Sequence, residues 1–202
     1  MALAQVVLVG AAIAAQAAPG PLASIERLDL ARYMGTWYEI AHFPNRFQSK
    51  CAGDTRAQYS AQADGTVRVV NRCRTADGDT IEAEGVARLV GAPGSAKLQV
   101  RFAPAWLSWL PAVWADYWVI DLVADYEVAA VSEPRREYLW ILARSPCVDR
   151  ARYAALVERL AALGLDTSRL QPTRHGAGSG EESPSDADAS RCRDARQGST
   201  MR

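Results

Sequence analysis

Eight short segments with the residue pattern of β-strands succeed one another along the chain. In the fifth segment, apolar Leu98, Val100 and Phe102 alternate with polar side chains, so they share one face of a strand. Asp64-Gly65 and Asp77-Gly78 supply tight hairpin turns between segments. The predicted strands span residues 36–42, 53–61, 66–74, 79–90, 96–102, 116–123, 126–132 and 137–144.

One helix follows the strands. Asp149 can cap it and Gly164 can end it, while Leu156, Leu160 and Leu163 form an apolar stripe at helical spacing. The last three predicted strands are apolar on both faces, so their outer face needs a cover. We therefore predict an all-β fold, an eight-stranded antiparallel up-and-down β-barrel with one C-terminal α-helix packed outside. Such a barrel has room for side chains or one small ligand.

The two ends of the chain differ from this middle part. Residues 1–18 are Ala-rich and uncharged, and Ala15-Gln16-Ala17 fits a cleavage site, which predicts a secretory signal peptide. A basic n-region is missing, and a retained anchor is the alternative. Residues 171–202 are rich in Gly, Ser and charged residues, which predicts a disordered tail. The barrel domain is therefore expected at residues 19–170.

Charge and metal-ligand content exclude several kinds of partner. Lys plus Arg number 23 and Asp plus Glu number 23, so no basic field attracts nucleic acid. The chain has only two histidines, His42 and His175, and no Cys-x-x-Cys motif, so we expect no metal site. No cofactor is expected either.

Four cysteines fit an oxidising compartment. Cys51 begins one strand of the hairpin that turns at Asp64-Gly65, and Cys73 ends the other, so a Cys51–Cys73 disulfide is favoured. Cys147 is a rival partner for Cys51, and Cys192 lies in the predicted tail. No cysteine precedes Cys51, so no lipid-modified N-terminus is expected.

Gly35 allows the turn that begins the first strand, and Trp37 is large enough to plug one end of a small barrel. The most distinctive blocks of the sequence are residues 33–41, 43–48, 84–85, 116–119, 125–126 and 138–146. In these blocks the chain resembles the lipocalin family, closest to the group of bacterial outer-membrane lipocalins, plant temperature-induced lipocalins and apolipoprotein D. The match covers about Leu28 to Leu170.

The resemblance implies that Trp37 packs at the closed end of the barrel and that Arg144 lies across it. A cation–π contact of this kind is worth about 0.5–2 kcal/mol. One departure is Ala124, where the family often has Thr before Asp-Tyr. Another is the missing lipobox cysteine, so a membrane anchor is not carried over.

Strand alternation from Arg144 puts Trp140 and Tyr138 in the barrel interior above it. The same alternation puts Tyr59, Val69, Val100, Phe102 and Tyr117 inside, and the resemblance puts Phe43 and Phe47 at the open mouth. An apolar, aromatic pocket suits an acyl chain or a flat lipophile. The resemblance implies a carrier of fatty acid, lysophospholipid or a similar lipid, acting in envelope lipid storage, transport or repair. The alternative is that these residues only fill the core.

Residues 104–114 form an uncharged loop with Trp106, Leu107, Trp109 and Leu110. It can make transient contact with a membrane surface, fold over the mouth or meet a second subunit. We expect an exported monomer or weak homodimer in the periplasm, with the outer membrane as a site of association, and not lipid-anchored.

Two further function classes stay open. Some lipocalins modify lipids. A barrel thiol could be a nucleophile if a base activated it, but nothing in the sequence fixes His42 near a cysteine. Glu39 could act as acid or base, although a structural hydrogen bond is its favoured role. No catalytic triad or phosphate loop is present in the sequence, so we expect no enzyme. A chaperone-like or structural envelope protein acting through the Trp-rich loop is the other alternative.

Overall fold

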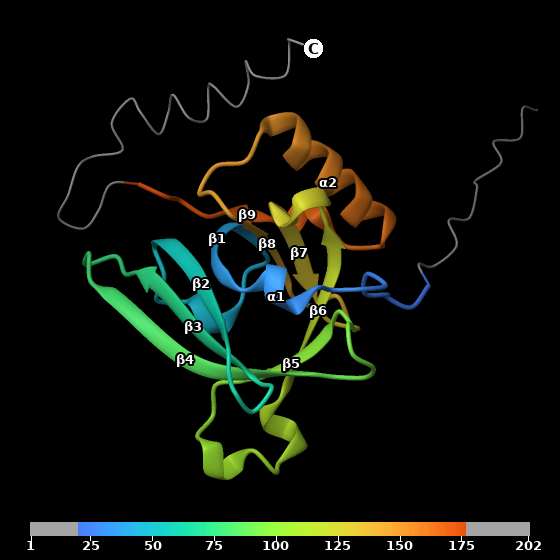
Figure 1. The fold of residues 1–202 in the computed structure, drawn as a ribbon. Helices are drawn as coiled ribbons and strands as arrows, with labels where there is room; N and C mark the ends of the chain where they lie inside the picture. Colours follow the sequence, from blue (N-terminus) through green and yellow to red (C-terminus); the bar gives the residue numbers. More distant parts are fainter. Residues whose placement is uncertain (1–19, 177–202) are drawn as a thin grey trace, which may run out of the picture.

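The computed structural model describes residues 20–176 of the 202-residue chain (Figure 1). The predicted signal peptide and most of the predicted tail lie outside the described residues. Among the residues described, no helix is long and apolar enough to cross a membrane. The strands are β1 Gly35–His42, β2 Gly53–Ala61, β3 Val67–Arg74, β4 Thr80–Leu89, β5 Lys97–Arg101, β6 Ala115–Leu122, β7 Val128–Ser132, β8 Leu139–Ala143 and β9 Gln171–Pro172. The α-helices are α1 Leu30–Tyr33 and α2 Arg150–Ala162, with short 3-10 turns η1 Arg46–Gln48, η2 Ala105–Leu107, η3 Pro111–Val113, η4 Ala124–Tyr126 and η5 Thr167–Arg169.

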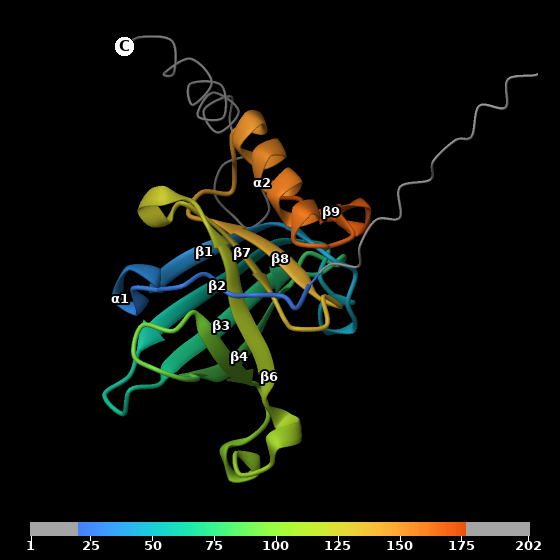
Figure 2. The ribbon, with the colours of Figure 1, turned by 90° about the vertical axis from the view of Figure 1, so that its right-hand side faces the viewer.

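Strands β1 to β8 form the predicted closed barrel (Figures 1 and 2). Each strand pairs antiparallel with the next, and β8 pairs with β1 to close the sheet. The connections β1–β2, β3–β4, β5–β6 and β7–β8 therefore lie at one end, which we call the mouth. The short helix α1 and the other connections lie at the opposite, closed end. The predicted fold class is confirmed.

Arg144 stabilises the closed end of the barrel by packing on Trp37 and by donating hydrogen bonds to backbone carbonyls. The Arg144 guanidinium carbon lies 4.0 Å from the centre of the Trp37 ring, and Trp37 is fully buried. Arg144 Nη1 donates to Thr36 O at 3.0 Å, and Nη2 donates to Arg32 O at 2.6 Å. Gly35 has φ +97°, and a Cβ there would lie 3.3 Å from Arg144 Nη1. A side chain at position 35 would therefore strain the backbone and press on the guanidinium.

Two apolar clusters stabilise the domain. One lines the barrel interior, and the other lies between the outer face of the barrel and α2. Figure 2 shows α2 against the outside of the barrel. As predicted, Asp149 caps α2 by accepting from Arg152 N at 3.0 Å, and Leu156 and Leu160 are fully buried. Burying each of these leucines is worth about 1.5–3 kcal/mol. The helix is the cover that the apolar outer face requires.

A β-bulge changes the facing of residues in β1. The register between β1 and β8 shifts between Glu39 and Ala41, so strict alternation ends there. Trp37 and Glu39 are buried on the inner side, whereas Ala41 and Phe43 belong to the outer cluster beneath α2. Phe43 follows β1 at the mouth end, but its predicted role in lining the ligand pocket is wrong, because the bulge turns its side chain to the outer face.

The end of the folded domain lies further along the chain than expected. β9 pairs with Ala41 and His42 of β1, where β1 no longer pairs with β2. Thr173 N donates to Ile40 O at 2.9 Å, and Asp54 N donates to Arg174 O at 2.8 Å. Residues 171–176, which we call the seam segment, thus join the two strands beside the mouth. They are part of the barrel and not of a tail.

Cys51 and Cys73 form the predicted disulfide, with their Cα atoms 5.5 Å apart. It joins the connection that precedes β2 to the end of β3, at the mouth. Cys147 is therefore not the partner of Cys51, and it is not free. Cys192 lies outside the described residues.

Candidate ligand-binding site

The barrel interior brings together most of the predicted ligand-binding residues. Five of them pack in the inner cluster: Tyr59, Val69, Val100, Tyr117 and Trp140. Phe102 reaches the same face, because its ring lies 2.8 Å from where a Cβ at Gly85 would be, and Gly85 is paired with Val69. Phe102 is 45% exposed, so it lies at the rim and not deep inside.

An aromatic stack leads from the surface into this interior. Phe47, in η1, is 65% exposed, and its ring centre lies 5.7 Å from that of Tyr138. The Tyr138 ring lies 5.8 Å from the Trp140 ring, with their planes 9° apart. Three predicted residues therefore form a continuous row of aromatic rings from the exposed Phe47 to the inner cluster. Phe43 does not contribute, since its ring lies beneath Arg169 in the outer cluster.

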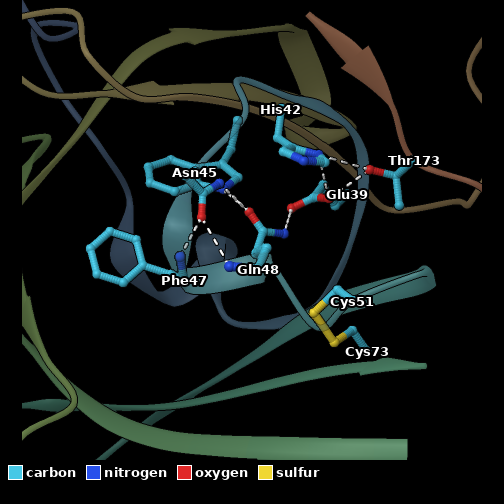
Figure 3. The surroundings of a disulfide bond; sticks show 9 residues. Glu39, His42, Asn45, Phe47, Gln48, Cys51, Cys73 and Thr173 are labelled. Atoms are coloured by element: carbon cyan, nitrogen blue, oxygen red, sulfur yellow. Dashed lines mark hydrogen bonds and ion pairs between the residues drawn. A yellow bond between two sulfur atoms is a disulfide. The ribbon is translucent and has the colours of Figure 1, made fainter. Parts of the chain in front are cut away.

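The carboxylate of Glu39 is buried near the mouth, in contact with Gln48, His42 and Thr173 (Figure 3). Glu39 is 3% exposed. It accepts hydrogen bonds from Gln48 Nε2 and from Thr173 Oγ1, each at 2.6 Å. His42 Nδ1 lies 2.9 Å from Glu39 Oε1. These contacts compensate the carboxylate for the loss of water, as a buried charge requires.

Gln48 connects the carboxylate to the aromatic stack. Its Oε1 accepts from Trp140 Nε1 at 2.9 Å and from Asn45 Nδ2 at 2.6 Å. Asn45 also caps η1, because its Oδ1 accepts from the backbone N of Phe47 and of Gln48. Gln48 therefore fixes both the Trp140 ring and the β1–β2 connection, residues 43–52, which we call the mouth loop. The sequence analysis missed this role of Gln48. The spacing of Asn45 and Gln48, three positions apart, is that of a helix-capping pair and could have indicated it.

Three tyrosine hydroxyls meet deeper in the barrel. Tyr117 Oη lies 2.8 Å from Tyr33 Oη and 2.9 Å from Tyr59 Oη. Burial raises the pKa of Tyr59 to about 12. Burial likewise holds the pKa values of Tyr33 and Tyr117 well above their ordinary value. All three phenols are therefore neutral at physiological pH. Sequence reasoning missed Tyr33, which lies on α1 before the first strand.

The polar cluster at the mouth does not have the geometry of a catalytic triad. His42 Nδ1 faces both Glu39, at 2.9 Å, and Thr173 Oγ1, at 3.3 Å. A relay needs one imidazole nitrogen for the nucleophile and the other for the carboxylate. Here Thr173 donates directly to Glu39, which stabilises the seam segment. His175, the second histidine, is also ordered, and its Nε2 lies 2.6 Å from Glu39 O.

The Trp-rich loop projects from the barrel on the side away from α2 (Figures 1 and 2). Trp106 is 73% exposed and Trp109 is 74% exposed, while Leu107 and Leu110 are half-buried. At the base of the loop, the Trp114 ring lies 4.0 Å from the Arg88 guanidinium carbon. The loop thus presents two tryptophans to its surroundings.

Comparison with known proteins agrees with this architecture. A family model described as a lipocalin-like domain matches residues 28–175. Temperature-induced lipocalin-1 of Arabidopsis thaliana is 42% identical over 151 residues, which cover 74% of this chain and 80% of that protein. Outer membrane lipoprotein Blc of Escherichia coli (strain K12) is 35% identical over 153 residues, covering 75% and 82%. Apolipoprotein D of Mus musculus is 29% identical over 156 residues, covering 73% and 77%.

Solved structures show the same fold at lower identity. Apocrustacyanin C1 is 18% identical with a TM-score of 0.59, covering 86% of this chain and 96% of that chain. Insecticyanin from the tobacco hornworm Manduca sexta is 18% identical with a TM-score of 0.59, covering 79% and 86%. The barrel, the Arg144–Trp37 contact and the family match lead to one conclusion. This chain belongs to the lipocalin family.

Proposed function

We propose that this protein binds and carries a small lipophilic ligand in the barrel interior and catalyses no reaction. Lipocalins generally bind small hydrophobic ligands. The finer part of the proposal is that the ligand is a fatty acid, lysophospholipid or similar lipid. The observation that carries it is the aromatic stack Phe47–Tyr138–Trp140, which leads from an exposed ring to the inner apolar cluster.

The contacts of Trp140 support this role. Its indole N–H is already satisfied by Gln48, so the ring can offer its apolar surface to a ligand without leaving a buried donor unpaired. Covering such a surface is worth about 25 cal/mol per Å² of apolar area. An acyl chain or a flat ring system can use this term, whereas a small polar solute cannot.

Titration with a fluorescent fatty acid tests the proposal, together with native mass spectrometry of the exported protein. We expect saturable, stoichiometric uptake without turnover. Trp140→Leu should weaken affinity about 10-fold, because the smaller side chain offers the ligand less apolar surface, at about 25 cal/mol per Å², and leaves Gln48 Oε1 without its indole donor. Trp140→Arg should abolish binding. Trp106→Leu is the control, since that ring is exposed on the loop. If the wild-type protein takes up no fatty acid, lysophospholipid or other lipophile, the carrier function is refuted.

We further propose export to the periplasm and a role in envelope lipid storage, transport or repair, in association with the outer membrane. The Cys51–Cys73 disulfide supports an oxidising compartment. The bacterial relative is named as an outer membrane lipoprotein, which supports the same location. Cell fractionation tests this, and recovery of the reduced protein from the cytoplasm would contradict it.

Transient membrane contact is a second candidate activity, favoured by the exposure of Trp106 and Trp109. Tryptophan is well suited to the interface between lipid and water. Flotation with liposomes should show binding that Trp106→Ser and Trp109→Ser reduce. No flotation, or no loss in the variants, would end this idea and favour a mouth cover or a weak homodimer contact. Native mass spectrometry would detect the dimer.

A further inference from the structure

The three tyrosine hydroxyls lie across the lumen of the barrel. Tyr59 is on β2 and Tyr117 is on β6, and three strands separate β2 from β6 in either direction around the closed sheet. Their hydroxyls nevertheless lie 2.9 Å apart, so the two side chains reach each other from opposite walls. No alkyl chain fits between hydroxyls at that distance. We call Tyr33, Tyr59 and Tyr117 the tyrosine floor.

Tyr33 connects the tyrosine floor to Trp37 at the closed end of the barrel. The Tyr33 ring centre is 4.8 Å from that of Trp37 and 5.6 Å from that of Tyr59. Tyr33 is 2% exposed and Tyr59 is 7% exposed, whereas Tyr117 is half-buried. Tyr117 is thus the member of the floor that is most open. The hydroxyl contacts of the floor therefore close the lumen to an alkyl chain on the side of the closed end.

The tyrosine floor has three hydroxyl hydrogens but only two hydrogen bonds to use them. Each phenol has one O–H and can accept two hydrogen bonds. Three hydroxyls share two contacts, both through Tyr117, and the described residues offer these hydroxyls no other partner. When Tyr33 and Tyr59 both donate to Tyr117, the remaining hydrogen is that of Tyr117. A donor that faces an apolar lining without an acceptor costs free energy, so an acceptor at this place is stabilising.

We propose that the tyrosine floor is a subsite that donates a hydrogen bond from Tyr117 to a neutral acceptor oxygen at the buried end of the ligand. A ketone, ester or ether oxygen fits this chemistry. The inference rests on the proposed carrier function and specifies which lipophiles it prefers. Val69, Val131 and Leu142 are buried apolar neighbours in the same cluster, so the floor offers the ligand a polar contact within an apolar lining.

An ionised headgroup does not fit the floor. Arg144 is the cation that acts electrostatically on Tyr33 and Tyr59. Its guanidinium is already bonded to the carbonyls of Thr36 and Arg32 and lies against Trp37. A carboxylate at the floor would lose its water without gaining an uncommitted cation. A fatty acid therefore binds with its carboxylate at the mouth and its chain end on the floor.

A matched pair of probes tests the subsite. Hexadecanoic acid and 15-oxohexadecanoic acid differ only in a ketone near the chain end, and each competes against a fluorescent fatty acid. We expect the oxo acid to bind about 2- to 10-fold more tightly, which is the range of a net neutral hydrogen bond. Tyr117→Phe should reduce this ratio to about one. Tyr153→Phe, the same change on α2 outside the barrel, should leave the ratio as in wild type.

The outcomes separate the two proposals. Equal affinity of wild type for both acids would overturn the subsite while leaving the carrier function standing. A preference that survives in Tyr117→Phe would also overturn it, provided that thermal unfolding shows the variant to be folded. If neither acid nor the fluorescent probe binds wild type, the carrier function fails and the subsite fails with it.

Discussion

Gln48 is expected to control both stability and ligand exchange. Gln48→Ala removes one of the donors to the Glu39 carboxylate, at 2.6 Å, and the acceptor of Trp140 Nε1, at 2.9 Å. A hydrogen bond to a charged group is worth about 1.5–3 kcal/mol and a neutral one about 0.5–1.5 kcal/mol. Glu39 is 3% exposed, so water replaces the lost donor poorly. We expect the free energy of unfolding to fall by about 2–4 kcal/mol.

Thr173→Val is the matched comparison, because it removes another donor to Glu39 without touching the mouth loop. Urea unfolding should show a loss of about 1.5–3 kcal/mol for this variant. Release of a fluorescent fatty acid, followed by stopped flow, should separate the two. Only Gln48→Ala frees η1 and Trp140, and it should speed release about 2- to 10-fold.

Two results would refute this reasoning. A loss of stability below about 0.5 kcal/mol in Gln48→Ala would mean that Glu39 is not dependent on this donor. Equal acceleration of release by both variants would mean that the whole network, and not the link from Gln48 to Trp140, governs the mouth.

Three other predictions concern stability. Replacing Cys51 and Cys73 by Ala should lower the free energy of unfolding by about 3 kcal/mol, as expected for a loop closed over a sequence separation of 22; an unchanged urea midpoint would contradict this. Arg144→Met removes the cation–π contact and the hydrogen bonds to three carbonyls, so thermal unfolding should show a loss of about 3–5 kcal/mol. Arg152→Met, which breaks only an exposed ion pair with Glu127, should cost less than about 1 kcal/mol, and similar losses would refute the closed-end role of Arg144. Burial raises the pKa of Tyr59 from 10.0 to about 12. Between these pH values only the unfolded chain releases the Tyr59 proton. The contribution of Tyr59 to the free energy of unfolding is therefore complete below pH 10 and is lost as pH rises towards 12. The loss from Tyr59 amounts to up to about 3 kcal/mol, and Tyr59→Phe should remove this part of the alkaline sensitivity in urea unfolding at pH 9 and pH 11.5.

The sequence was sufficient for the barrel because alternation and turn signals agree. Leu98 and Val100 alternate with polar residues as a strand with one buried face requires, and Asp64-Gly65 forms a turn in which Gly65 has φ +82°. The Cys51–Cys73 disulfide followed from the same hairpin. Such features are local, so composition and spacing reveal them.

What could not be predicted depends on long-range backbone contacts. Strict alternation of side chains along a strand cannot predict the bulge between Glu39 and Ala41. The bulge turns the Phe43 side chain away from the predicted ligand site. The seam segment is polar and begins with Gln171-Pro172, so its composition is typical of a tail. Its order comes from bonds to Ile40 and Asp54, which lie more than a hundred residues earlier in the chain.

The two ends of the barrel are stabilised by different kinds of contact, and this difference decides where a ligand exchanges. At the closed end, Trp37 is fully buried and Arg144 binds several backbone carbonyls at once, so opening would expose an indole and unpair those groups together. At the mouth, Phe47 is 65% exposed, and the loop is held by Gln48, which bonds Trp140 and Glu39, and by the Cys51–Cys73 disulfide at its far end. Local opening follows the less costly route, and a loop with few buried contacts opens before a packed end does. We therefore expect the mouth loop to open before the closed end does, and the proposed tyrosine floor would be where an entering chain stops.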